Sequence, residues 1–103
     1  MKIYPKKSLG QNFLIDKNIL EKIVNVTSIK DRIVLEVGPG TGNLTSYILK
    51  KKPKKLFVVE KDNNLVKDLH KNFDNQITII NDDILNIDEN LLFNEKVIVF
   101  GNL

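Results

Sequence analysis

Four short runs of mainly apolar residues recur along the chain, and each is bounded by glycine, proline, asparagine or charged residues. Runs of this length between turn-forming residues are typical of strands buried in a parallel sheet. We predict such strands at residues 34–37, 56–59, 77–80 and 97–100.

Between these runs, apolar residues recur three or four positions apart, as they do on one face of a helix. Before the first strand, Asp16 is expected to cap a helix. Its buried stripe would consist of Ile19, Leu20, Ile23, Val24 and Thr27. A second helix is predicted to start near Asn43 and to stop at Pro53, which lacks the N–H that a helix interior needs. A third, capped by Asp62, is predicted over residues 63–73. Its stripe would consist of Leu65, Val66, Leu69 and Phe73.

Strands that alternate with helices predict an α/β, Rossmann-like fold with about four parallel strands. A chain of 103 residues is one domain at most and is smaller than most complete doubly wound enzymes. We therefore expect residues 1–103 to be a piece of a larger domain.

The first predicted strand leads into G-P-G-T-G, with glycines at positions 38, 40 and 42. Glycines leave the backbone bare, so a small polar ligand can lie against N–H groups at the positive end of the next helix. A dinucleotide fingerprint would place its third glycine where Asn43 stands. With Glu36 before the first glycine and Pro39 after it, the turn resembles the cofactor loop of class I S-adenosylmethionine methyltransferases. An ordinary strand–helix turn or another nucleotide site is the alternative.

Acidic residues follow the second and third predicted strands. In open α/β sheets ligands lie beyond the carboxyl ends of the strands, and an acid about 20 residues after the glycine turn can accept both hydrogen bonds of a ribose diol. Glu60, 22 residues past Gly38, is assigned this role, with a solvated turn residue as the alternative. Asp83 could accept a hydrogen bond from an adenine amino group, with Ile84 against the ring. Asp82 is interpreted as a solvated neighbour, and on local sequence alone both acids are more often turn residues.

Composition limits the classes of chemistry. The chain has no cysteine, and His70 is its single histidine, so disulfides, thiolate metal sites and histidine clusters are ruled out. We assign His70 no chemistry. The longest apolar stretches are about five residues, far short of a membrane span, and the N-terminus lacks the apolar core of a signal peptide. We expect a soluble, cytoplasmic protein without a membrane partner.

Charge is unevenly distributed along the chain. Residues 1–55 carry 12 Lys/Arg against 4 Asp/Glu, whereas residues 56–103 carry 4 against 9. Five of the lysines fall within residues 50–55. A basic half indicates a polyanionic partner. The alternative is that these lysines solvate the end of a helix and complement its dipole.

Five motifs, in this order and spacing, together resemble the ribosomal RNA adenine dimethyltransferase family. They are K-S-L-G-Q-N-F-L-I-D, L-E-V-G-P-G-T-G-N-L-T, V-V-E-K-D, N-D-D-I-L and V-F-G-N-L, and they cover essentially the whole chain. The opening S-L-G-Q-N-F-L resembles the bacterial dimethyladenosine transferases more closely than the 23S rRNA methylases of the erythromycin-resistance type. The resemblance implies dimethylation of adenine amines in small-subunit (16S) rRNA, with S-adenosyl-L-methionine as cofactor, no metal, and the rRNA or the immature small ribosomal subunit as partner.

The resemblance also implies a set of site residues. Cofactor contacts would come from Asn12, Leu14, Gly38, Glu60, Asp83 and Asn102. Asn102 would be catalytic as well, because it would open the family's Asn-Leu-Pro-aromatic motif, of which the first two residues are present. The family's later strands and helical RNA-binding domain are not among these residues, so we expect the 103-residue chain to bind the cofactor without methylating RNA by itself.

Two other classes of function stay open on the sequence. One is an RNA-binding assembly factor without catalysis, and the other is a nucleotide-binding half-domain of the dehydrogenase type. Calorimetry with S-adenosylmethionine against NAD would separate the dehydrogenase type from the rest. The oligomeric state is not predicted.

Overall fold

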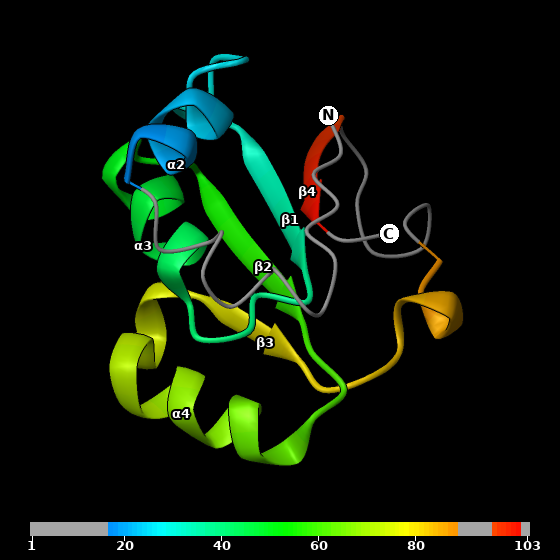
Figure 1. Cartoon of the computed structure of the whole chain (residues 1–103). Helices are drawn as coiled ribbons and strands as arrows, with labels where there is room; N and C mark the ends of the chain where they lie inside the picture. The colour runs from blue at the N-terminus through cyan, green and yellow to red at the C-terminus, as the bar shows by residue number, and fades with distance from the viewer. Residues whose placement is uncertain (1–16, 89–95, 102–103) are drawn as a thin grey trace.

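The structure, a computed structural model, describes residues 17–88 and 96–101 (Figure 1). The described part contains four strands, at Ile33–Val37 (β1), Lys55–Val59 (β2), Thr78–Ile80 (β3) and Val97–Gly101 (β4). Its α-helices are Lys17–Val24 (α2), Asn43–Lys50 (α3) and Asn63–Phe73 (α4). Short 3-10 turns follow at Asp74–Gln76 (η1) and Ile84–Asn86 (η2).

The four strands form one parallel sheet in the order β3-β2-β1-β4. The first strand, β1, lies inside the sheet. The next two strands, β2 and β3, are added on one side of it, and β4 is added on the other side. Val37 pairs with Val59, and Val59 pairs with Ile80, so β1, β2 and β3 end level with one another. This confirms the predicted Rossmann-like α/β fold, and it places the point of reversal, where such sheets bind ligands, beside the end of β1.

The core lies mainly between the sheet and its helices. In Figure 1, α2, α3 and α4 lie on the same side of the sheet. This is expected for α3 and α4, which connect β1 to β2 and β2 to β3 in one direction. The buried residues on this side are Leu20, Ile23, Val24, Ile29, Val34, Leu44, Ile48, Leu56, Val58, Leu69, Phe73, Ile77 and Phe100. On the other face, strand residues Leu35, Val37 and Val59 pack with Ile84 and Ile87 of the segment around η2.

The predicted stripe of α2 is correct except at its end. Leu20, Ile23 and Val24 are buried, but the helix ends at Val24 and leaves Thr27 exposed. Just beyond the helix, the N–H of Asn25 still bonds the carbonyls of the preceding turn, and the chain then bends towards β1. Ile29, which is 2% exposed, takes the place in the core that the pattern had assigned to Thr27.

The second helix is shorter than predicted. It ends at Lys50 instead of continuing to Pro53, because Lys52 adopts a left-handed backbone with φ of 57°. The N–H of Lys52 bonds the carbonyl of Leu49, which closes the turn. Most of the lysine-rich segment is therefore a turn and the start of β2, not a helix end.

The third helix matches its prediction at both ends. Asp62 caps α4 with its Oδ1 atom, which accepts hydrogen bonds from the N–H groups of Asn64 at 2.8 Å and Leu65 at 3.2 Å. The cap fixes where α4 begins, and thereby fixes the short connection from the end of β2. None of the helices in residues 17–88 and 96–101 is long and apolar enough to cross a bilayer.

Candidate cofactor site

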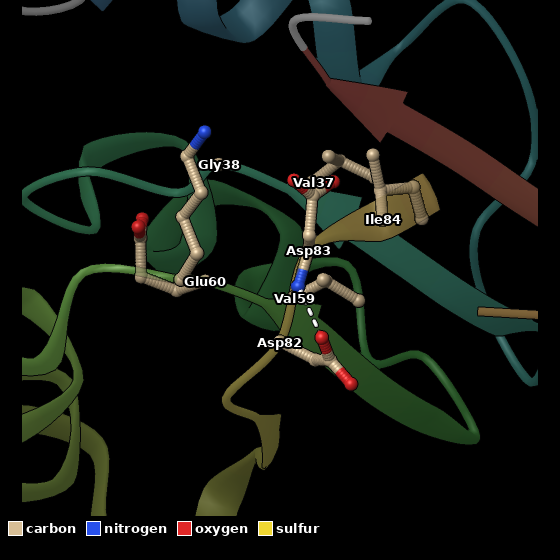
Figure 2. Close-up of a pocket in the computed structure, with 8 residues that line it drawn as sticks. Val37, Gly38, Val59, Glu60, Asp82, Asp83 and Ile84 are labelled. Carbon is tan, nitrogen blue, oxygen red and sulfur yellow. Dashed lines mark hydrogen bonds between the residues drawn. The ribbon is translucent and has the colours of Figure 1, made fainter. Parts of the chain in front are cut away.

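A pocket of about 170 Å³ lies at the carboxyl ends of β1, β2 and β3 (Figure 2). It is lined by Val37, Gly38, Val59, Glu60, Lys61, Asp82, Asp83 and Ile84. The structure therefore brings together three of the residues predicted for the site, Gly38, Glu60 and Asp83. Because small-molecule pockets usually enclose about 300 Å³ or more, these residues would surround only part of a ligand, such as its nucleoside portion.

Gly38 offers open backbone to a ligand. Its φ is 66°, and a Cβ atom added there would meet nothing within 4 Å. The N–H of Gly38 donates to the carbonyl of Val59 at 2.9 Å, so this group extends the pairing of β1 with β2. A ligand could lie against the bare surface of Gly38, but this N–H is already used within the protein.

Gly42 is required for a different reason from the one the sequence suggested. A Cβ atom at this position would lie 2.6 Å from Cε2 of Phe73, and φ is 90°. Its N–H donates to the carbonyl of Pro39 at 3.0 Å. Gly42 therefore lets α4 pack against the start of α3, and it does not clear space for a ligand.

Glu60 is buried, with 7% of its surface exposed, and is anchored on both sides. Its N–H donates to the carbonyl of Ile80, and its Oε2 accepts from the N–H of Asp62, each at 3.0 Å. A carboxylate offers about four acceptor positions, and no other described residue bonds the Oε1 atom of Glu60. The carboxylate is therefore held in place with acceptor capacity left over.

Asp83 and Asp82 form the third side of the pocket. Oδ1 of Asp83 accepts from the N–H of Leu85 at 2.9 Å and thereby caps η2. Oδ1 of Asp82 accepts from the Asn86 amide at 2.8 Å. It also accepts from the N–H of Asp83 at 2.7 Å, the bond drawn in Figure 2. These bonds lower the pKa of the exposed Asp82. The acids thus do form the turn that local sequence favours, and the half-buried Asp83 also lines the pocket.

A buried pair, Glu36 and Thr45, lies beneath the glycine turn. Oγ1 of Thr45 donates to Oε1 of Glu36 at 2.6 Å, which joins β1 to α3 directly. Burial raises the pKa of Glu36 to about 7; the Thr45 hydrogen bond opposes this rise, and the charge of Glu60 adds to it. The sequence analysis did not identify Thr45. The sequence pattern that could have identified it is a hydroxyl residue between the apolar Leu44 and Ile48, which are buried on the core side of the helix.

Three predicted site residues lie outside the described residues. They are Asn12, Leu14 and Asn102, and their roles stay predictions. Lys61 lines the pocket although it was not predicted; its signal was a cation directly after Glu60. Within the described ranges, no three His, Asp or Glu side chains are grouped in a way that could hold a metal ion.

Residues 4–103 match the family described as Ribosomal RNA adenine dimethylase. A ribosomal RNA small subunit methyltransferase A from Pelagibacter ubique is 61% identical over 103 residues, which is 100% of this chain and 39% of that protein. The protein of the same name from a Sulfurihydrogenibium species is 43% identical over 107 residues, 99% of this chain and 42% of that protein. The chain thus spans about two fifths of the length of these curated relatives.

Solved structures with a similar fold are methyltransferases. A dimethyladenosine transferase from Plasmodium falciparum matches with a TM-score of 0.71 and 28% identity, over 85% of this chain and 32% of that one. The 23S rRNA methyltransferase ErmE matches with a TM-score of 0.71 and 26% identity, over 84% of this chain and 35% of that one.

Proposed function

Because this chain belongs to the ribosomal RNA adenine dimethylase family, we propose that it supplies the N-terminal, cofactor-binding part of a longer rRNA (adenine-N(6),N(6))-dimethyltransferase. The enzyme would use S-adenosyl-L-methionine to dimethylate adenine amines in small-subunit (16S) rRNA of the immature subunit, in the cytoplasm. The observation that carries the proposal is the meeting of Gly38, Glu60 and Asp83 in one pocket at the ends of three adjacent strands.

The choice of substrate rests on the relatives. Two curated relatives at 61% and 43% identity carry the name of a small-subunit rRNA methyltransferase. The 23S rRNA methyltransferase has the same fold at 26% identity. The small subunit is therefore the better-supported substrate.

The described residues fit the proposed cofactor. The open backbone at Gly38 leaves room where a Cβ would otherwise stand. The held carboxylate of Glu60 has acceptor capacity for two ribose hydroxyls. Asp83 would accept from the adenine amino group, with Ile84 beside the ring. Asn12, Leu14 and Asn102 would complete the contacts.

S-adenosyl-L-methionine supplies an electrophilic methyl group when it is bound. The protein's task is to hold the target adenine amine in line with that group and to draw its protons away from the ring plane. In this proposal the amide oxygen of Asn102 accepts a hydrogen bond from one N–H of the amine, and the proton leaves to solvent after the nitrogen has taken the methyl group. Positioning and a fixed acceptor provide the catalysis, and the target base must leave its stack to reach the pocket.

The test uses the full-length protein and calorimetric titration with S-adenosylmethionine and with NAD. We expect binding of the first and none of the second. Glu60→Ala should weaken S-adenosylmethionine binding at least tenfold, because hydrogen bonds to a charged group contribute about 1.5–3 kcal/mol. Asp68→Ala, which removes an exposed acid from α4, is the matched control and should leave binding unchanged. Thermal melts of both variants show whether they fold.

A second measurement tests the substrate. Labelled S-adenosylmethionine is incubated with the full-length protein and with immature small or large ribosomal subunits. We expect label in the small subunit, as dimethyladenosine. Label in the large subunit alone would identify a 23S rRNA methylase, and binding of both cofactor and rRNA without methyl transfer would identify an assembly factor.

A further inference from the structure

The amino ends of the strands carry a dense group of cations, at the edge of the sheet opposite the candidate cofactor site. This group, the basic end, consists of Lys30, Arg32, Lys50, Lys51, Lys52, Lys54, Lys55 and Lys96. The residues come from three separate stretches of sequence. The fold brings them together, so the group is larger than the lysine run that the sequence shows.

Strand register explains how the basic end forms. Ile33 of β1 pairs with Lys55 of β2 and with Val97 of β4, so Arg32 and Lys96 directly precede two adjacent strands, and Lys55 begins a third. Neighbouring strands are about 4.8 Å apart, which spaces these cations in a row. Because α3 runs back from the carboxyl edge, its last residue, Lys50, returns to the same end (Figure 1).

Backbone hydrogen bonds hold the two loops of the basic end side by side. The N–H of Asp31 donates to the carbonyl of Lys52 at 3.1 Å, and the N–H of Lys54 donates to the carbonyl of Arg32 at 2.9 Å. The cations therefore stand on a fixed surface. Lys52, Lys54 and Lys55 are exposed on it.

Cations outnumber acids at this end of the described part of the chain. Among the described residues the acids at this edge are Asp31, within the first loop, Asp74, between α4 and β3, and Glu21, whose Oε2 lies 3.9 Å from Nζ of Lys51. The opposite edge carries three acids, Glu60, Asp82 and Asp83, against one cation, Lys61, around the pocket. The sheet is therefore positive at its amino edge and negative at its carboxyl edge.

Resting on the proposed function, we propose that the basic end is a second rRNA-binding surface, which contacts the phosphate backbone on the far side of the sheet from the base that enters the pocket. The acidic edge repels phosphates, so attraction to the RNA has to come from elsewhere on the protein. A row of cations at the starts of neighbouring strands matches a line of phosphates better than a single anion. RNA is also the polyanion that the proposed reaction already brings to the enzyme.

The test compares two double variants of the full-length protein that remove equal charge. Lys52→Gln/Lys55→Gln alters the basic end, and Lys67→Gln/Lys71→Gln alters exposed lysines of α4. Affinity for deproteinised small-subunit rRNA is measured across a salt series. We expect the first variant to bind about tenfold more weakly at physiological salt and to lower the slope of log affinity against log salt by about two. The α4 variant should match the wild type, and both should bind S-adenosylmethionine normally.

Equal losses in both variants, or no loss in the first, would overturn the proposal and leave the lysines as a solvated surface. A loss seen with assembled immature subunits but not with deproteinised rRNA would also overturn it, in favour of an acidic ribosomal protein. The proposed function fails differently. That function would be refuted if the wild-type protein did not bind S-adenosylmethionine and did not methylate rRNA. The difference between the two variants in RNA binding would still decide the role of the basic end.

Discussion

Replacing the buried Glu36 with glutamine should change how the stability of the protein depends on pH. The side chain is 2% exposed, and its pKa rises from 4.5 to about 7 on burial. At about 1.4 kcal/mol per pKa unit, this rise corresponds to roughly 3 kcal/mol of stability that depends on protonation. Glutamine has a similar size and keeps an oxygen that can accept from Thr45, so the variant mainly removes the titration.

The direction follows from proton binding in the two states. Below pH 4.5 the carboxyl group is protonated whether the protein is folded or unfolded, and its stabilising contribution is complete. Between pH 4.5 and about 7 the unfolded chain releases this proton while the folded protein keeps it, so the free energy of unfolding falls as pH rises. Above about pH 7 both states are ionised and the loss is complete. Glu36→Gln removes this loss.

Urea unfolding of the full-length protein at pH 4.5 to 8.5 gives the measurement. Because only Glu36 is replaced, the difference between wild type and Glu36→Gln reports the titration of Glu36 together with its coupling to Glu60. From pH 4.5 to 8 the variant should gain up to about 3 kcal/mol relative to the wild type. Asp68→Asn, at an exposed position on α4, should show no such gain. A flat difference curve for Glu36→Gln would mean that the pKa of this carboxyl group is the same in the folded and unfolded protein, and would refute the reasoning.

Two further variants separate ligand contacts from local structure. In Gly38→Ala the added Cβ meets open space, so the variant should lose only about 1–2 kcal/mol of stability through its positive φ, but its S-adenosylmethionine affinity should fall more than tenfold. Gly42→Ala places its Cβ against Phe73 and should lower the melting temperature more than Gly38→Ala does. Equal effects of the two variants on both measurements would remove Gly38 from the site. Asp83→Asn keeps an oxygen for the N–H of Leu85 and should therefore melt normally while binding the cofactor about tenfold more weakly; unchanged calorimetric affinity would show that this carboxylate does not contact the ligand.

The sequence predicts the strands and α4 well because local pattern decides them. An apolar run marks a buried strand, and Asp62 caps α4 through N–H groups two and three residues away. The ends of α2 and α3 are decided by contacts that a local pattern does not contain. Lys52 turns left-handed where its carbonyl accepts from the N–H of Asp31, 21 positions earlier in the chain. The pairing of Glu36 with Thr45 escaped prediction for a related reason, since it joins a strand to the next helix across a turn.

Structural and ligand-binding roles, which the sequence presents as alternatives for each acid, are compatible in one side chain. Asp83 caps η2 through Oδ1, and Glu60 holds the N–H of Asp62 through Oε2. Each bond uses part of a carboxylate that has about four acceptor positions. The local bond costs the site little acceptor capacity and fixes the rotamer, so the remaining oxygen would meet a ligand without first losing side-chain freedom. A turn-forming acid at a strand end is therefore a better candidate for ligand binding when its turn bond is made. Burial is needed as well, because Asp82 makes two such bonds through Oδ1 and yet lies at the exposed rim of the pocket.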